Sequence, residues 1–111
     1  SEVHVRQGST LSLTCSLRGT SSSEVSNLTW YHDNQPILLE TARNSLSLAT
    51  ERSENFISSR LLLPRASAID GGNYTCRPAD ALPASVLVHV LNGKLNCLFC
   101  LYWFEEGIRI L

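Results

Sequence analysis

The chain has 111 residues, with nine basic and ten acidic side chains and a formal net charge of -1. This length supports one domain with a single modest core. The balanced charge provides neither a basic footprint for nucleic acid nor an acidic interaction tail, so electrostatics identifies no partner.

The first fifteen residues open directly into strand-like sequence, with no signal peptide before it. We therefore expect a fragment of a longer protein whose first strand is truncated. Around Cys15, the stretch TLSLTCSL alternates, so that Leu13 and Cys15 share an inward face with other leucines. Cys15 is thus predicted to lie on a half-buried strand.

The middle of the chain alternates in the same way, through SNLTWYH, the short edge-like piece QPILL, NSLSLAT, SSRLLLPRA and ASVLVHV. Turn-rich clusters separate these runs, and the sequence shows almost no helix signal. This spacing predicts an all-β fold, an antiparallel β-sandwich. The inward residues are expected to be Leu28, Trp30, Leu46, Leu48, Leu61, Leu63, Ala66, Val86, Val88 and Val90.

The stretch DGGNYTC, residues 70–76, predicts a tight corner that leads into a buried strand. Tyr74 and Cys76 occupy alternate positions, so both point inward. Asp70 and Gly72 precede the strand, where a turn needs a residue that bonds its own backbone and one that tolerates an unusual φ.

Four cysteines, Cys15, Cys76, Cys97 and Cys100, allow three full pairings. Patterning favours a disulfide between Cys15 and Cys76, because both are predicted to point inward. This pair closes a loop of about sixty residues, which the chain-entropy model values at roughly 4 kcal/mol. Such a bond requires an oxidising compartment, so we expect secretion or display at the cell surface.

The arrangement of Cys15, Trp30 and Cys76 resembles that of an immunoglobulin domain, in which a disulfide joins two sheets and a tryptophan packs on it. Tyr74, two residues before the second cysteine, occupies the tyrosine-corner position, whose hydroxyl bonds backbone upstream. The core residues that we single out are Trp30, Tyr74, Leu13, Leu61, Leu63 and Val88.

Three stretches make the resemblance specific to one family of immunoglobulin domains. They are GSTLSLTC, LTWYHDNQPI and the long run from SSRLLLPRA to ASVLVHVLNG. Together they resemble the second, membrane-proximal immunoglobulin domain of the Dpr (defective proboscis extension response) family of insect neuronal surface proteins. The resemblance covers roughly residues 2–93, and we assign residues 1–93 to one immunoglobulin-like domain.

The Dpr resemblance implies an extracellular protein at the neuronal plasma membrane and synapse, associated with the membrane through its parent protein. In this family, Dpr-interacting proteins bind the first domain, which lies outside this chain. The present domain would then act mainly as a stem that orients the recognition domain. The Dpr resemblance implies no nucleic-acid partner and no small-molecule substrate.

Two glycosylation sequons occur, at Asn27 and Asn73. Because the neighbouring residues are predicted to face inward, both asparagines should face outward, near opposite ends of one sheet face. Glycans there would crowd that face and favour the stem role. Its outward residues are expected to be Thr29, Tyr31, Thr75, Arg77, Leu87 and His89.

The same face provides the alternative, a directly adhesive binding module. Leu87, His89 and Tyr31 are predicted to be exposed, and they could form a small apolar patch for a partner or a second copy.

At the corner, immunoglobulin domains commonly pair the acidic residue with a basic one near the start of a neighbouring strand. Arg43 and Arg52 are the candidates for Asp70, and Arg43 is favoured because Arg52 lies at the far end of that strand.

No catalytic constellation is recognisable, so we expect no enzyme activity, no cofactor and no metal. His4, His32 and His89 lie on different predicted elements without ligand spacing. Cys97 and Cys100 form a lone C-x-x-C without the second pair of a structural zinc site.

Residues 94–111 do not fit the domain. The apolar run from Leu95 to Phe104 is too short to cross a bilayer, which takes about twenty residues. We expect an apolar tail outside the sandwich core whose cysteines do not pair with Cys15 or Cys76. A truncated or altered reading frame and an acylated membrane-associated tail are the two explanations left open.

Overall fold

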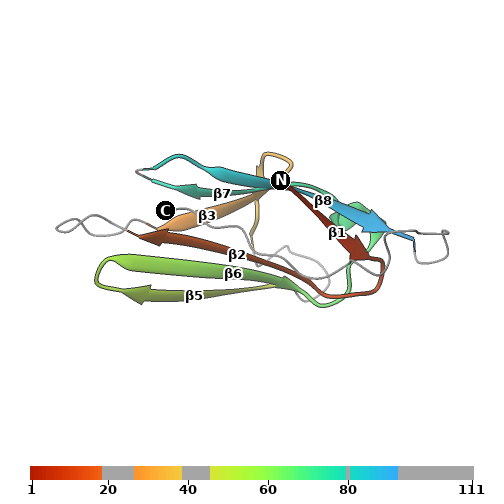
Figure 1. Cartoon of the computed structure of the whole chain (residues 1–111), viewed down its shortest axis with the longest axis horizontal. Coiled ribbons are helices and arrows are strands. Elements are labelled where there is room, and N and C mark those ends of the chain that lie inside the picture. Colours follow the sequence, from red (N-terminus) through yellow and green to blue (C-terminus); the bar gives the residue numbers. More distant parts are fainter. Residues whose placement is uncertain (19–26, 39–45, 80, 93–111) are drawn as a thin grey trace.

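The computed structural model describes residues 1–18, 27–38, 46–79 and 81–92. Their strands form two layers, as Figure 1 shows. One sheet has the order β1-β8-β7-β3-β4 and the other the order β2-β6-β5. The elements are β1 (Glu2–Arg6), β2 (Leu11–Arg18), β3 (Leu28–His32), β4 (Gln35–Pro36), β5 (Ser47–Ser53), β6 (Phe56–Leu63), the 3-10 helix η1 (Ala68–Asp70), β7 (Gly72–Pro78) and β8 (Ala84–Leu91).

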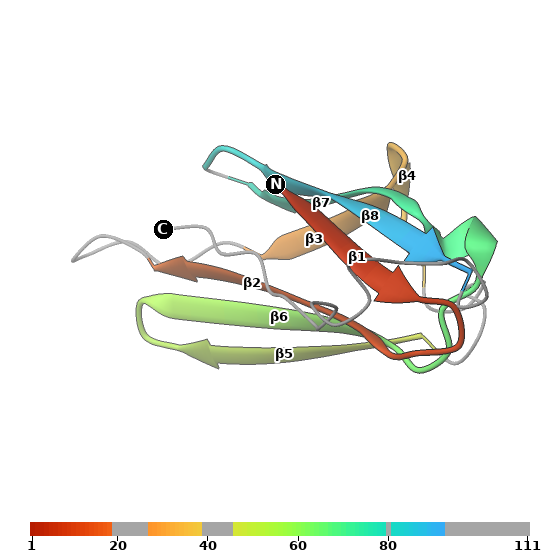
Figure 2. The same cartoon turned by 45° about the vertical axis from the view of Figure 1, so that its right-hand side comes forward.

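The predicted all-β sandwich is confirmed, with one difference in strand direction. Most neighbouring strands are antiparallel, but β1 pairs with β8 in parallel, from Glu2 opposite Leu87 to Arg6 opposite Leu91. The two strands lie side by side in Figure 2. Val3 and Val5 of β1 are buried, so this strand closes one side of the core.

The core lies between the two sheets, because alternate residues of each strand point inward. All six core residues singled out from the sequence are buried. Leu28, Leu46, Leu48 and Val90 are only partly buried and pack against this core. The buried apolar residues are Val3, Val5, Leu11, Leu13, Cys15, Leu17, Trp30, Ile57, Leu61, Leu63, Ala66, Tyr74, Cys76, Val86 and Val88.

The predicted disulfide between Cys15 and Cys76 is confirmed, and both residues are fully buried. Because Cys15 belongs to β2 and Cys76 to β7, the bond joins the two sheets.

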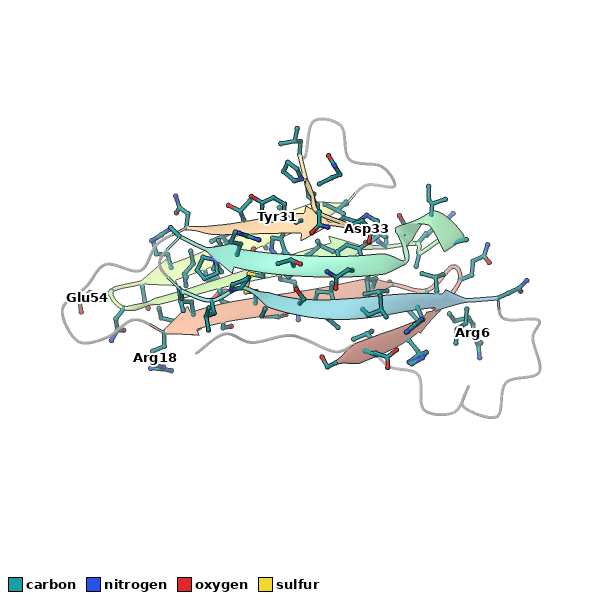
Figure 3. The ribbon with its side chains drawn as sticks, turned by 90° about the horizontal axis from the view of Figure 1, so that it is seen from above. Arg6, Arg18, Tyr31, Asp33 and Glu54 are labelled. Atoms are coloured by element: carbon teal, nitrogen blue, oxygen red, sulfur yellow. A yellow bond between two sulfur atoms is a disulfide. The ribbon has the colours of Figure 1, made fainter. Side chains whose placement is uncertain are left out.

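The two ends of the sandwich differ, and Figure 3 shows Arg18 and Glu54 at one end and Arg6 at the other. We call the first the hairpin end, because the β5–β6 and β7–β8 turns lie there, and the second the corner end, because η1 precedes β7 there. Helix η1 does not follow from the sequence pattern, since three residues are too few for a helical periodicity.

Two sequence-based expectations lie outside the described residues. They are the fate of the apolar tail, residues 94–111, and the position of Arg43. Within the part of the chain that the structure describes, no helix is long and apolar enough to cross a membrane.

Candidate functional site

The candidate site is the outer face of the five-stranded sheet, the side of β1, β8, β7 and β3 turned away from the second sheet. The strand registers bring its predicted residues together. Thr29 lies opposite Arg77, and Tyr31 lies opposite Thr75. Leu87 and His89 follow on β8, the next strand in the sheet.

Arg77 and Tyr31 form a contact within this face. The Arg77 guanidinium carbon lies 5.4 Å from the centroid of the Tyr31 ring, which is the geometry of a cation–π interaction. Tyr31 is therefore half-buried rather than fully presented, while Thr29 beside it is exposed.

Thr75 corrects the sequence-based expectation of an exposed contact residue. It points to the outer face, yet only 7% of it is exposed. Its hydroxyl is 2.8 Å from that of Ser85 on β8, and it accepts a hydrogen bond from the Asn73 side-chain amide at 3.4 Å. Thr75 thus joins β7 to β8 and offers little surface to a partner.

Strand β1 adds residues to the face that the sequence analysis did not include. The rings of His4 and His89 are stacked, with centroids 4.6 Å apart, and His89 Nε2 lies 2.5 Å from a carboxylate oxygen of Glu2. The bond to His89 lowers the pKa of the exposed Glu2 carboxyl. The parallel register predicts this stack, because it places His4 opposite His89.

Leu87 is the large apolar side chain that remains most open on the outer face, at 40% exposure. It lies directly opposite Asn73 in the β7–β8 register. Tyr31 and His89, by contrast, are engaged by Arg77 and by His4.

The two sequon asparagines lie at opposite ends of the sheet, as expected, but the Asn27 side chain contacts the other sheet and does not lie over the outer face. Asn27 is exposed and immediately precedes β3 at the hairpin end, whereas Asn73 is half-buried near the start of β7 at the corner end. The Asn27 side-chain oxygen accepts a hydrogen bond from the Arg52 guanidinium of the other sheet.

The bond to Asn27 bears on Arg52, one of the two candidates for Asp70. It holds Arg52 at the hairpin end, whereas Asp70 lies at the corner end, about the length of β7 away. Arg52 is therefore not supported as the partner of Asp70. Arg43 lies outside the described residues.

The corner is built by hydrogen bonds around Asp70 and Tyr74. The Tyr74 hydroxyl donates to the Asp70 carbonyl at 2.5 Å, which is the tyrosine-corner bond. The Asp70 carboxylate accepts from the backbone N–H of Ser67 at 2.7 Å and from its hydroxyl at 3.0 Å. Burial, with smaller contributions from the charges of Asp70 and Asp33, raises the pKa of the Tyr74 phenol above its usual range.

Gly72 has the unusual φ expected for it, although it is the first residue of β7 and not part of a turn before the strand. Its φ is +131°, and a Cβ atom there would lie 2.6 Å from a carboxylate oxygen of Asp33. The same carboxylate accepts the backbone N–H of Asn73 at 2.9 Å. The glycine thus lets the turn after β3 approach β7 closely.

His32 belongs to the framework of the corner. Its ring stacks on Tyr74 with centroids 4.3 Å apart, and its Nε2–H donates to the Gly71 carbonyl at 2.9 Å.

A neighbouring cleft of about 400 Å³ is lined mainly by apolar residues, among them Ile37, Leu38 and Ile69. Among the described residues, no group of His, Cys, Asp and Glu side chains is arranged to hold a metal ion.

The comparisons with known proteins agree with this architecture. The protein-family model described as "Immunoglobulin domain" matches residues 1–87. The chain belongs to the immunoglobulin domain family. This fold family is non-enzymatic, in agreement with the expectation from the sequence.

Among curated proteins, the chain is 32% identical over 89 residues to the mouse (Mus musculus) leucine-rich repeat, immunoglobulin-like domain and transmembrane domain-containing protein 2. The match covers 80% of this chain and 15% of the mouse protein. The chain therefore spans a small part of that relative's length.

Among solved structures, the chain is similar to one in the complex of Dpr2 Ig1-Ig2 with DIP-Theta Ig1-Ig3. The TM-score is 0.69 at 30% identity, covering 82% of this chain and 46% of that one. A chain of the ZIG-8–RIG-5 IG1-IG1 heterodimer shares the fold, with a TM-score of 0.60 at 23% identity, covering 83% and 82% of the two chains. The immunoglobulin domain is thus similar to those of cell-surface recognition and adhesion proteins.

Proposed function

We propose that this immunoglobulin domain is the extracellular, orienting domain of a Dpr-type cell-surface recognition protein in neurons. In this role it holds a separate recognition domain at a fixed distance and angle from the membrane. That recognition domain would bind a surface partner of the Dpr-interacting-protein type at the synapse.

The observation that carries the orienting role is that most of the outer face is engaged in contacts within the domain. Arg77 packs over Tyr31, and the Thr75 hydroxyl pairs with Ser85. A partner would have to break or cover these contacts before gaining any of its own. Binding faces usually present anchor side chains that the partner can enclose, so this arrangement favours a structural role.

The opposite edge of the face is engaged in the same way. His89 is stacked on His4 and bonded to Glu2, so β1 and β8 are linked by side chains as well as by their backbones. These links stiffen the sheet, which suits a domain that sets the orientation of another.

The Dpr assignment is supported by the similarity to the Dpr2–DIP-Theta complex at 30% identity. The ZIG-8–RIG-5 match adds support for the fold alone, because its identity is only 23%.

A directly adhesive module is the second candidate, because Leu87 and Thr29 stay exposed and Tyr31 and Arg77 are residue types common at binding hot spots. In this case the outer face itself would hold a partner.

The experiment uses the 111-residue chain, secreted with Asn27→Gln and Asn73→Gln so that no glycan hides the face. The secreted chain is made multivalent and added to cells that express immunoglobulin-type surface proteins. We expect no saturable binding to these cells. The Dpr2 and DIP-Theta pair is the positive control.

Saturable binding would contradict the orienting role if Arg77→Glu on the outer face abolished it. Arg60→Glu is the matched control, because Arg60 is exposed on β6 of the other sheet. Loss of binding with Arg77→Glu, but not with Arg60→Glu, would establish the adhesive alternative.

A further inference from the structure

Asn73 and Leu87 are neighbours on the outer face, and this juxtaposition joins a glycosylation sequon to an exposed apolar side chain. The two residues are opposite each other on β7 and β8. Leu87 is 40% exposed, whereas inward-pointing Val86 and Val88 on the same strand are buried.

Asp33 lies on the other side of Asn73, at the turn that follows β3. Its backbone N–H donates to the Asn73 carbonyl at 2.8 Å, and its carboxylate accepts the Asn73 backbone N–H at 2.9 Å. Across the sheet, the order is therefore Leu87, Asn73, Asp33. The Asp33 carboxylate itself lies toward the inner side of the sheet, 3.6 Å from Nε2 of His32, whose ring stacks on inward-pointing Tyr74. A group attached to the outward Asn73 side chain therefore has Leu87 as its neighbour.

The sequon hydroxyl is already close to the asparagine. The Asn73 Nδ2 donates to the Thr75 Oγ1 at 3.4 Å, which fixes the amide over the sheet. Attachment of a sugar replaces one of the two Nδ2 hydrogens, so the other can keep this bond.

We propose that Asn73 carries an N-linked glycan whose first sugar lies flat on the outer face, against Leu87. This inference extends the proposed orienting role, because it says what covers the open part of the face. The apolar side of an N-acetylglucosamine ring would cover Leu87.

The modification needs the oligosaccharide-transfer machinery of the secretory pathway and a lipid-diphosphate-linked oligosaccharide. A bond forms between the anomeric carbon of the first sugar and the Asn73 Nδ2. The bond from that carbon to the lipid diphosphate oxygen breaks, the lipid diphosphate leaves, and Nδ2 loses one proton. No redox change occurs.

Asn27 provides the comparison within the same chain. It is exposed at the hairpin end, and its side-chain oxygen is held by Arg52 of the other sheet. A glycan there projects beyond the end of the sandwich instead of lying across the outer face. Only the Asn73 glycan should therefore couple to Leu87.

The first test is site-resolved mass spectrometry of the chain secreted from insect cells. Reduction and trypsin separate the sequons into peptides 19–43 and 66–94. Enzymatic deglycosylation should convert Asn73 to Asp in the second peptide. An unmodified Asn73 would overturn the inference and leave the orienting role standing.

The second test asks whether the sugar packs on Leu87. In secreted protein, Asn73→Gln should lower the thermal midpoint by on the order of a few degrees, and much less so when Leu87→Ala is already present. Asn27→Gln is the control and should show no such coupling. The same Asn73→Gln change in unglycosylated bacterial protein separates the effect of the side chain from that of the sugar.

Equal effects of Asn73→Gln in the two Leu87 backgrounds would overturn the packing against Leu87. Binding by the glycan-free chain would instead overturn the orienting role, so the two failures are distinguishable.

Discussion

The indole N–H of Trp30 donates a hydrogen bond to the hydroxyl of Ser59 at 2.9 Å, and this bond crosses the core from one sheet to the other. Trp30 is paired with Cys76 in its own sheet, and Ser59 is paired with Cys15 in the other. The disulfide joins β2 to β7, and the hydrogen bond joins β6 to β3 beside it. The two links are therefore adjacent, because β2 is paired with β6 and β3 with β7. One link is covalent, and the other satisfies the single polar group of the buried indole.

Replacement of Ser59 by Ala should lower the free energy of unfolding by about 1–3 kcal/mol, because the buried indole N–H loses its acceptor. Chemical denaturation of the oxidised protein measures this change. Ser47→Ala, at an exposed position of β5, is the matched control and should change stability by less than about 0.5 kcal/mol. Equal stability of the two variants would show that the indole bond contributes little.

Gly72→Ala should be destabilising by more than about 1 kcal/mol, since it combines a positive φ with a clash against the Asp33 carboxylate. Gly8→Ala isolates the first effect, because Gly8 has a φ of +89° but no atom lies within 4 Å of the place that its Cβ would take. Thermal unfolding of both variants should show the larger loss for Gly72→Ala. Adding Asp33→Ala should recover part of that loss, and no recovery would argue against the clash.

Tyr74 predicts a loss of stability in alkali. Its folded-state pKa is raised by burial, so the neutral phenol is favoured in the folded protein while the unfolded chain ionises near pH 10. The stabilisation is fully present below that pH and is lost as the pH rises through the folded pKa. Tyr74→Phe should flatten the fall in unfolding free energy above about pH 10. An unchanged slope would remove Tyr74 as its cause.

Asp70→Asn should cost about 1.5–3 kcal/mol, because a buried carboxylate accepts two hydrogen bonds from Ser67. The pairing of Asp70 with Arg43 stays a prediction, and a double-mutant cycle with Arg43→Gln tests it. Additive effects of the two substitutions on the denaturation midpoint would exclude the pair.

The core and the disulfide could be predicted from the sequence because successive residues of a strand point alternately inward and outward. The same alternation predicts that Ser59 points inward, because it lies an even number of positions before Leu61 and Leu63. Two consecutive serines, however, are more typical of an exposed segment. The need of the indole for a partner was the additional clue.

The exposure of the outer face was harder to predict, because alternation gives the direction of a side chain and not its surroundings. Thr75 points outward, but it lies on a central strand between Tyr31 and Ser85, which cover it. The stack of His4 on His89 depends on the parallel pairing of β1 with β8, and a hydrophobic pattern does not encode strand direction.

The parallel β1–β8 ladder also has a mechanical consequence. Glu2 begins the ladder opposite Leu87, and Leu91 ends it opposite Arg6. A tension that pulls the start of β1 away from the end of β8 therefore acts along both strands and loads all rungs of the ladder together in shear. Antiparallel strands pulled at one shared end would open rung by rung like a zip. Should shear break the ladder, the disulfide between Cys15 and Cys76 would still hold the intervening chain against further extension.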